Sequence, residues 1–179
     1  IGGGVVGCII ARWLSRFEGK ILLIDKEVDI GMGSSSANTA IVHAGYDPLP
    51  GTLKARLNVK GNAMWDQLAG ELNFPYERRG DYVVAIGDEE LPTVYELYEQ
   101  GTKNGVPGLR VLTGDEMRSR EKNINPETSG ALWAPTGGIC DPFQVTIAAA
   151  ENAVMNGVTI LLETVFENFI MDGNRIIGI

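Results

Sequence analysis

Cysteine and histidine are scarce in this sequence, and their scarcity excludes two kinds of site. The 179 residues contain two cysteines, Cys8 and Cys140, and one histidine, His43. The cysteines form no C-x-x-C motif, and Cys8 falls in an apolar run where packing is its expected role. So few thiol and imidazole ligands argue against a metal site. Sparse cysteine is typical of a reducing compartment, so we expect a cytoplasmic protein.

Excess positive charge and long apolar runs are also missing. The chain carries 23 acidic and 15 basic residues, a net charge of -8. This balance argues against nucleic acid and anionic membrane surfaces as partners. No apolar run is long enough to span a bilayer, and no signal-peptide pattern is present. We expect a small-molecule substrate. Membrane association of a longer parent protein is possible, but nothing in this sequence indicates it.

The length and the two ends of the chain bound its domain organisation. The 179 residues allow one ordinary domain, or one domain and part of another, and the apolar fraction of 44% is normal for a globular chain. Only Ile1 precedes the first glycine of the opening motif, and the chain stops in a strand-like run at Ile179. We therefore expect a fragment of a longer protein.

Glycine, in contrast, is concentrated in the first seven residues. They match G-x-G-x-x-G at Gly2, Gly4 and Gly7, followed by a helical run over 8–17 and a strand-like run over 20–25. In a dinucleotide-binding βαβ unit the first glycine permits the tight turn and the second lets the backbone approach a pyrophosphate. The third lets the helix pack closely on the strand. The alternative is a glycine-rich turn that starts a βαβ unit and binds nothing.

An acidic residue completes the motif. Asp25 ends the second predicted strand at about the spacing expected for a carboxylate that binds a ribose hydroxyl. The helix that follows the glycines offers its unpaired N–H groups and the positive end of its dipole to phosphates. Together these features predict a dinucleotide site.

The stretch after Asp25 distinguishes the cofactor. A nicotinamide-binding domain continues from the second strand into another crossover helix and strand, whereas residues 31–45 are dense in Gly, Ser, Asn and Thr. Small hydroxyl and amide groups there suit a long cofactor that continues past its pyrophosphate toward a ring. The composition favours FAD over NAD. Serine caps predict a helix over 37–44.

The remaining pattern alternates between α/β and mixed architecture. We predict helices over 53–72, 91–104 and 142–156, a short helix opened by 113–116, strands over 74–77, 81–86, 110–112, 131–134 and 158–162, and a hairpin of 165–171 with 175–179. The predicted fold class is α/β: a Rossmann-like FAD-binding domain (1–73 and 140–179) with part of a mixed α+β substrate domain (74–139) inserted.

Three stretches carry a resemblance to a known family. The run from Ile1 to Cys8, the run from Ile21 to Glu27 and the run from Gly33 to Tyr46 resemble the FAD-dependent oxidoreductases of the D-amino-acid oxidase superfamily. Within it, residues 37–60 look like the bacterial glycerol-3-phosphate dehydrogenase branch, with the L-2-hydroxyglutarate oxidases as close neighbours. Residues 137–142 fit both. The motifs are specific for the flavin superfamily and much less so for the substrate.

The resemblance implies roles for individual residues. Gly2, Gly4 and Gly7 line the pyrophosphate, and Asp25, where many relatives carry Glu, takes the adenosine ribose. The other implied cofactor contacts are Lys26 beside the adenosine half, Ser34, Ser35 and Ser36 at the phosphates, Asn38 and Thr39 toward the flavin, and the backbone of Val165 at adenine. Each has a simpler alternative: an exposed lysine, a mobile serine loop, or an asparagine that only caps a helix.

His43 is the candidate catalytic residue. It follows Thr39 by four residues, one turn of the predicted helix, so both side chains can face the same way. Relatives have a histidine here near the flavin ring, which implies that His43 receives the hydroxyl proton of the substrate or holds the substrate's hydroxyl group. The alternative is a packed core histidine. Arg78 and Arg79 are candidates for an anionic substrate, but a solvated turn is the stronger interpretation.

The resemblance also implies a reaction. It favours flavin-dependent oxidation of a carbon that bears a hydroxyl group, with glycerol 3-phosphate converted to dihydroxyacetone phosphate. An enzyme for L-2-hydroxyglutarate or an amino acid is one alternative, and an FAD-binding module without turnover of its own is another. The sequence does not name the electron acceptor. Relatives complete the isoalloxazine site with later segments, so we expect residues 1–179 alone to hold flavin weakly.

Overall fold

The computed structural model describes all 179 residues, which form two compact units. The first unit comprises residues 1–39, 71–75 and 141–179, and the second comprises 40–70 and 76–140. The sequence assigned residues 40–70 to the FAD-binding domain, whereas the structure groups them with the middle of the chain. Which unit carries which function stays a prediction.

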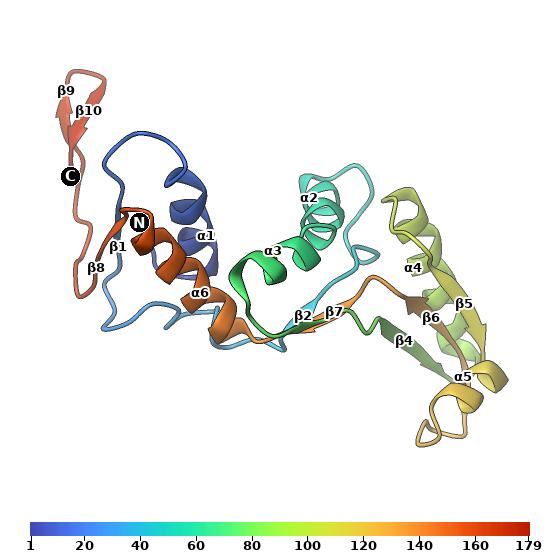
Figure 1. Ribbon diagram of the computed structural model, residues 1–179. Helices are drawn as coiled ribbons and strands as arrows, with labels where there is room; N and C mark the ends of the chain where they lie inside the picture. Colours follow the sequence, from blue (N-terminus) through green and yellow to red (C-terminus); the bar gives the residue numbers. More distant parts are fainter. The chain divides into compact units, whose positions relative to one another are not determined.

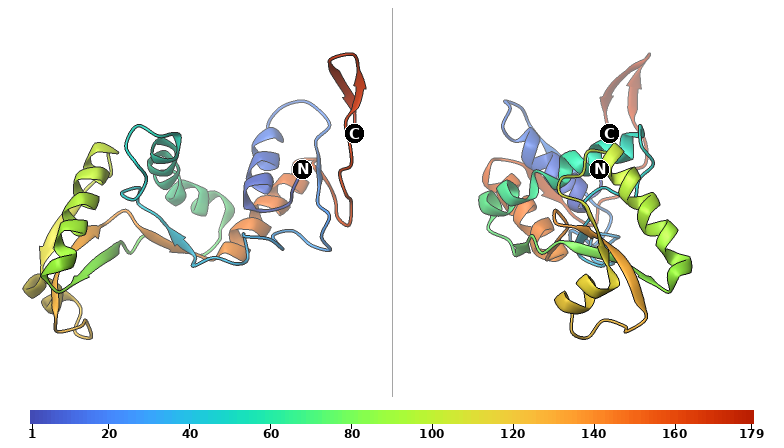
Figure 2. Two further views of the ribbon diagram at one scale, coloured as in Figure 1. Left: turned by 180° about the vertical axis from the view of Figure 1, so that it is seen from behind. Right: turned by 90° about the vertical axis from the view of Figure 1, so that its right-hand side faces the viewer.

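The first unit is a βαβ arrangement built on small residues. Helix α1 (Val5–Leu14) packs along helix α6 (Pro142–Met155), and strand β1 (Leu22–Ile24) pairs in parallel with β8 (Thr159–Leu161). Figures 1 and 2 show α1 and α6 side by side from opposite directions. Three alanines of α6 (Ala149, Ala150 and Ala153) are buried at the contact with Cys8 and Ala11 of α1. Small side chains allow helices α1 and α6 to approach each other closely, and this packing holds α1 in place after the turn that begins the chain.

Caps at the ends of α6 explain its bounds. The carboxylate of Asp141 accepts hydrogen bonds from the N–H groups of Phe143 and Gln144, at 2.9 and 3.0 Å, and Pro142 stands at the first helical position. Gly157 follows the helix with a φ of +90°. The same unit ends in the hairpin of β9 (Ile170–Asp172) and β10 (Arg175–Gly178).

The second unit contains two antiparallel sheets. One has the order β2-β7-β3, formed by Ile41–Val42, Gly138–Cys140 and Tyr76–Glu77; the other has the order β4-β6-β5, formed by Asp81–Ile86, Thr128–Ala134 and Arg110–Thr113. Leu132 of β6 packs with Val94 of helix α4 (Leu91–Lys103), while Ala131 packs with Met117 of α5 (Gly114–Arg120). The two helices therefore cover opposite faces of the second sheet. A short 3-10 helix (Asp88–Glu90) precedes α4.

Three predicted elements are wrong in type or extent. The helix predicted over 37–44 is absent: Ala40 has a φ of +61°, and Ile41 and Val42 form β2 against β7. The tertiary pairing overrides the serine pattern, and a branched pair such as Ile-Val favours a strand. The helix predicted over 53–72 is two helices, α2 (Leu53–Asn62) and α3 (Trp65–Leu72).

The strand predicted as buried at 158–162 is also different. Strand β8 spans only Thr159–Leu161, and its side chains are half-buried or exposed, because β8 pairs with β1 alone. Strand β7 had no counterpart among the predicted elements. Two of its three residues are Gly138 and Cys140, and that composition carries no local strand signal.

Candidate functional site

The glycine loop joins Ile1 to helix α1 at the end of strand β1. Gly2 has a φ of +96°, and its N–H donates to the carbonyl of Ile24 at 2.8 Å. A positive φ is readily available only to glycine, which explains why this residue begins the turn. Gly4 precedes α1 as its N-cap and provides no side-chain cap.

Gly7 and Gly4 are constrained differently. A Cβ on Gly7 would lie 1.9 Å from the carbonyl oxygen of Gly2, so only glycine lets the first turn of α1 approach the loop. A Cβ on Gly4 would meet a single atom within 4 Å, the Ser35 hydroxyl at 3.1 Å, and one on Gly2 would meet none. The chain therefore leaves space beside Gly2 and Gly4 and none beside Gly7.

Asp25 follows β1 and binds the glycine loop. One carboxylate oxygen accepts a hydrogen bond from the N–H of Gly3, and the other accepts one from the N–H of Glu27 at 2.9 Å. The bonds from Glu27 and then Gly3 lower the pKa of Asp25 below its ordinary value. The carboxylate is therefore ionised at neutral pH. Because an ionised carboxylate offers about four acceptor positions, it can still accept from a ribose hydroxyl.

The serine loop reaches the same helix terminus. The Ser35 hydroxyl accepts a hydrogen bond from the N–H of Val5 at 2.9 Å, so it caps α1 from 30 residues away. The N–H of Gly31 donates to the carbonyl of Gly3 at 2.9 Å, which fixes the loop to the turn. Ser35 and Ser36 also line a cavity of about 460 Å³ against the first turns of α6. Ser34 is exposed.

The other predicted cofactor residues of this unit lie at its surface. Lys26 is exposed and forms an ion pair with Glu27 at 3.5 Å. Asn38 donates from its amide to the carbonyls of Ser34 and Ser35, at 3.1 and 3.0 Å, so it closes the serine loop and caps no helix. Thr39 is exposed, and Val165 is exposed just after Thr164, whose N–H donates to the carbonyl of Asp25 at 2.9 Å. Their cofactor roles remain predictions.

His43 lies in the second unit, one residue after β2. Its side chain is exposed, which excludes the alternative of a packed core histidine. The amide of Asn62 donates to the carbonyl of His43 at 3.1 Å and to that of Thr136 at 2.8 Å. The expected helical relation to Thr39 is wrong because no helix spans these residues; strand β2 sets the direction of His43 instead.

Arg78 is fully engaged inside the second unit. Its guanidinium makes five hydrogen bonds, to the Asp66 carboxylate, to the side chain and carbonyl of Asn62, and to the carbonyl of Thr136. A guanidinium has five N–H groups, so none remains for an anionic substrate. The interpretation as a solvated turn is wrong for Arg78 and holds for Arg79, which is exposed and pairs with Glu77.

Sequence reasoning missed the polar groups near His43. Tyr46 lies in the loop after β2, Asn62 in α2 and Asp81 in β4, and no spacing in the sequence relates them. The Tyr46 hydroxyl donates to Asp81 Oδ2 at 3.3 Å, and burial raises the pKa of both side chains. The only available signal was an aspartate that begins a strand whose other residues are apolar or aromatic.

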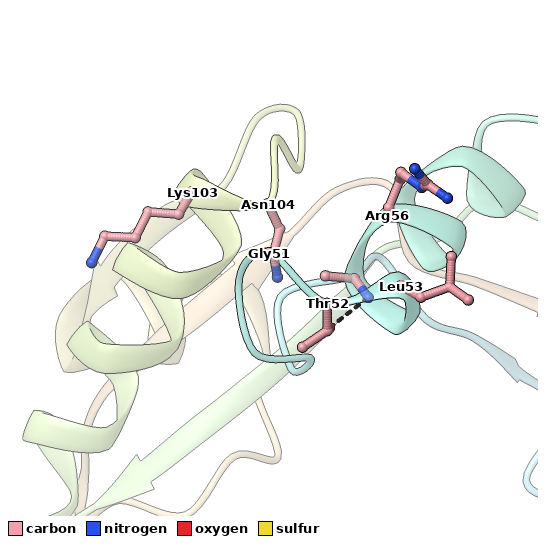
Figure 3. A pocket seen from close by; sticks show the side chains of 7 residues that line it. Gly51, Thr52, Leu53, Arg56, Lys103 and Asn104 are labelled. Carbon is pink, nitrogen blue, oxygen red and sulfur yellow. Dashed lines mark hydrogen bonds between the residues drawn. The ribbon is translucent and has the colours of Figure 1, made fainter.

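A separate pocket of the second unit has no predicted residue in its wall. It measures about 480 Å³ and lies beside the N-terminus of α2, where the Thr52 hydroxyl accepts from the N–H of Ala55 at 3.2 Å. Figure 3 shows that the charged ends of Arg56 and Lys103 point away from each other.

No group of three or more His, Cys, Asp or Glu in the chain is arranged to hold a metal ion. No helix has the length and apolar character needed to cross a membrane.

The comparison with protein families identifies the class. Residues 1–179 match the family described as FAD dependent oxidoreductase (DAO). The chain belongs to this family, which confirms the predicted family, fold class and FAD cofactor.

Two dehydrogenases are similar to this chain over most of its length. The chain is 52% identical over 162 residues to the glycerol 3-phosphate dehydrogenase of Caloramator mitchellensis, covering 90% of this chain and 34% of that protein. It is 36% identical to the mitochondrial L-2-hydroxyglutarate dehydrogenase of Nematostella vectensis, covering 85% of this chain and 33% of that protein. The chain thus spans about a third of the length of these relatives.

Solved structures share the fold. The L-alpha-glycerophosphate oxidase of Mycoplasma pneumoniae, solved with FAD bound, superposes with a TM-score of 0.87 at 29% identity, over 94% of this chain and 44% of the oxidase. The glycine oxidase of Bacillus cereus superposes with a TM-score of 0.84 at 25% identity, over 98% of this chain and 49% of that protein.

The residues of the glycine loop fit the diphosphate of FAD. The N–H groups of Val6 and Gly7 have no intrahelical acceptor, and the space beside Gly2 and Gly4 contains no side chain except the Ser35 hydroxyl. A helix N-terminus with open backbone in front of it binds phosphate groups. When bound, FAD supplies an acceptor for a hydride.

Proposed function

We propose that the full-length protein is an FAD-dependent dehydrogenase that oxidises glycerol 3-phosphate to dihydroxyacetone phosphate. The observation that carries this proposal is the 52% identity to the Caloramator dehydrogenase over 90% of this chain. The substrate loses a hydride from the carbon that bears the hydroxyl, together with the hydroxyl proton, so two electrons pass to the cofactor.

Roles for the chain's own residues follow from this proposal. Gly2, Gly4 and Gly7 with the serine loop hold the diphosphate, and Asp25 accepts from the ribose. Lys26, Asn38, Thr39 and Val165 complete the contacts along the cofactor. The open helix terminus and the two spare acceptor positions of Asp25 support this assignment. His43 receives the hydroxyl proton, and its exposure makes the imidazole accessible to a substrate.

A second candidate is an L-2-hydroxyglutarate dehydrogenase, favoured by the 36% identity to the Nematostella protein. Both substrates are small anions with a hydroxyl on the oxidised carbon, so His43 would have the same task in each. An FAD-binding module without turnover is the third candidate. A cytoplasmic location fits the sparse cysteine content, and the net charge of -8 disfavours nucleic acid as a partner.

Anaerobic bleaching of the flavin in the full-length protein distinguishes the three candidate functions. Glycerol 3-phosphate, L-2-hydroxyglutarate and glycine are added separately, and dithionite shows that the flavin can be reduced. Fastest bleaching by glycerol 3-phosphate supports the proposal, and fastest bleaching by either other substrate contradicts it. Bleaching by dithionite alone indicates a binding module.

Replacing His43 tests its assigned role. If His43 handles the hydroxyl proton, His43→Ala should slow flavin reduction roughly 10²- to 10⁴-fold while FAD stays bound. That loss corresponds to about 3–5 kcal/mol of transition-state stabilisation. Stopped-flow reduction without oxygen, beside a thermal melt, makes the measurement. An unchanged rate with a lower melting temperature would assign His43 a structural role.

A further inference from the structure

The carboxylate of Asp81 occupies the space that a side chain at position 137 would fill. A Cβ on Gly137 would lie 2.8 Å from Asp81 Cγ and 3.0 Å from Oδ1. The N–H of Gly80 donates to the carbonyl of Gly137 at 2.8 Å, which holds the start of β4 against this glycine. Any residue other than glycine at 137 would displace the carboxylate.

His43 lies across the sheet from the same glycine. Strand β2 pairs with β7 through Ile41 opposite Ile139 and Val42 opposite Gly138, so the register extended by one residue puts His43 opposite Gly137. The Asn62 amide, which binds the carbonyls of His43 and Thr136, keeps the two segments together beyond the last strand pair.

Directly opposite residues of an antiparallel pair project to the same face, with Cβ atoms about 4.5–5.5 Å apart. The side chain of His43 therefore projects to the face on which Asp81 covers Gly137. The electrostatic influence of His43 on the pKa of Asp81 agrees with a short distance between the two side chains. Burial raises the pKa of Asp81, while the hydrogen bond from Tyr46 and the charge of His43 oppose that rise.

One oxygen of Asp81 has no partner in the chain. Oδ2 accepts from the Tyr46 hydroxyl at 3.3 Å, whereas Oδ1 is buried and accepts no hydrogen bond. A buried carboxylate oxygen without a donor is costly, so such atoms in native proteins normally have one. An imidazole N–H is a suitable donor, and His43 is the residue opposite Gly137.

We propose that Asp81 is a positioning residue for His43, with Oδ1 accepting an N–H of the imidazole. This bond would direct the other ring nitrogen toward the substrate and stabilise the imidazolium that forms when the hydroxyl O–H bond breaks and its proton moves to that nitrogen. Tyr46 anchors the carboxylate from the other side, and Gly137 provides the space for it. The inference rests on the proposed function for its catalytic meaning, but the Asp81–His43 contact is independent of the substrate.

A double-variant cycle in the full-length enzyme tests the catalytic part. Asp81→Asn should slow anaerobic flavin reduction by about 10- to 100-fold, less than the roughly 10²- to 10⁴-fold contribution of a general base. In a His43→Gln background the same change should have no further effect, because Asp81 acts through His43. Additive losses would overturn the inference. Asp88→Asn, which removes an exposed carboxylate of the same unit, is the matched control and should keep the rate.

Stability separates this role from a structural one. A carboxyl whose folded-state pKa is raised contributes stability below its unfolded pKa and loses it as the pH rises through the folded value. Because burial raises the pKa of Asp81, ionisation of this carboxyl lowers the stability of the fold. Asp81→Asn should therefore melt at the same or a higher temperature while it reacts more slowly. A lower melting temperature, with the rate loss explained by unfolded enzyme, would contradict the inference.

Nuclear magnetic resonance of ¹⁵N-histidine-labelled full-length protein tests the contact without turnover. The His43 imidazole signals are assigned by their loss in His43→Gln. We expect a downfield N–H proton that shifts or disappears in Asp81→Asn and stays in Asp88→Asn. An imidazole spectrum unchanged by Asp81→Asn overturns the inference, whatever the rates. If His43→Gln reduces its flavin at the wild-type rate while the spectrum responds to Asp81→Asn, the contact holds and the proposed role of His43 fails.

Discussion

Gly4 and Gly7 stand three residues apart and respond to different constraints. A side chain on Gly7 would overlap the carbonyl of Gly2, whereas one on Gly4 would point into space bounded only by the Ser35 hydroxyl. Gly4 therefore leaves space for the proposed ligand, and Gly7 is required by the packing of the fold. The G-x-G-x-x-G motif predicted the same division of roles.

Substitution should separate the two glycines. We expect Gly4→Val to abolish FAD binding in the full-length protein and keep the fold, because its branched side chain would fill the space where a diphosphate touches backbone. Gly7→Ala should lose both, because its Cβ cannot fit. Flavin content after purification and circular dichroism make the comparison, with Gly61→Ala on the open face of α2 as control. Normal FAD content in Gly4→Val would disprove its assigned role.

Arg78 shows how a side chain that suits anion binding can be committed elsewhere. Its five hydrogen bonds join α2, the start of α3 and the turn at Thr136, close to the backbone of His43. It therefore supports the segment that carries His43 and offers no donor to a substrate.

Removing Arg78 should cost stability and spare substrate affinity. Arg78→Ala leaves Asn62 Oδ1 without a donor and removes one of the two donors to the Thr136 carbonyl. We therefore expect a loss of roughly 1–3 kcal/mol in the free energy of unfolding. The KM for glycerol 3-phosphate should stay the same for the folded fraction. Arg79→Ala is the matched control, because Arg79 is exposed and pairs only with Glu77. A large rise in KM with unchanged denaturant midpoint would return Arg78 to the substrate site.

At the scale of elements, strand β1 and the loop before α1 are joined through one carboxylate. Asp25 accepts from Gly3 in the glycine loop and from Glu27 beyond the strand, and these bonds lower its pKa. Helix α1 in turn receives its cap from Ser35 of the serine loop. The predicted diphosphate site is thus assembled by three segments before any cofactor is present.

This arrangement predicts a pH dependence for the first unit. A carboxyl whose folded-state pKa is lowered contributes stability above its unfolded pKa, about 4, and loses it as the pH falls through the folded value. Wild-type stability should therefore fall as the pH decreases below about 4, and Asp25→Asn should show a shallower fall. Urea midpoints between pH 5 and pH 3 measure both. Parallel curves for the two proteins would mean that the Asp25 bonds contribute nothing.

At the scale of the molecule, each unit has its own buried core, but the first unit leaves many apolar side chains uncovered. Val6, Phe17, Leu22 and Val165 are exposed, at 69%, 62%, 47% and 67%. The parallel pair β1 and β8 forms a sheet of two strands, with neither flanked by a further strand. The chain spans about a third of the length of its named relatives.

Isolated residues 1–179 should therefore differ from the full-length protein. Exposed apolar surface binds hydrophobic dyes, so we expect stronger fluorescence of the dye ANS per molecule and weak or no retention of FAD. Both are measured on the two purified proteins at equal concentration. A yellow 179-residue chain with one FAD per molecule would contradict this prediction.

The elements that sequence reasoning located correctly depend on interactions within a few residues. The G-x-G-x-x-G turn leads into α1, Thr113 caps α5 with Glu116 in a reciprocal pair, and Asp141 caps α6. Glycine geometry and capping act over at most a few positions, so residue order alone is sufficient to reveal them. The family resemblance follows from the same local motifs.

Tertiary structure alone decided the rest, because it depends on contacts between distant parts of the chain. Residues 41–42 form a strand because they pair with β7, which lies almost 100 positions later in the chain. Ser35 caps a helix that begins 30 residues earlier. Asp81 and His43, 38 positions apart, are both brought beside Gly137 by the pairing of β2 with β7 and by the start of β4. The free energy of such contacts outweighs local propensity, and no periodicity in the sequence encodes which distant residues will meet.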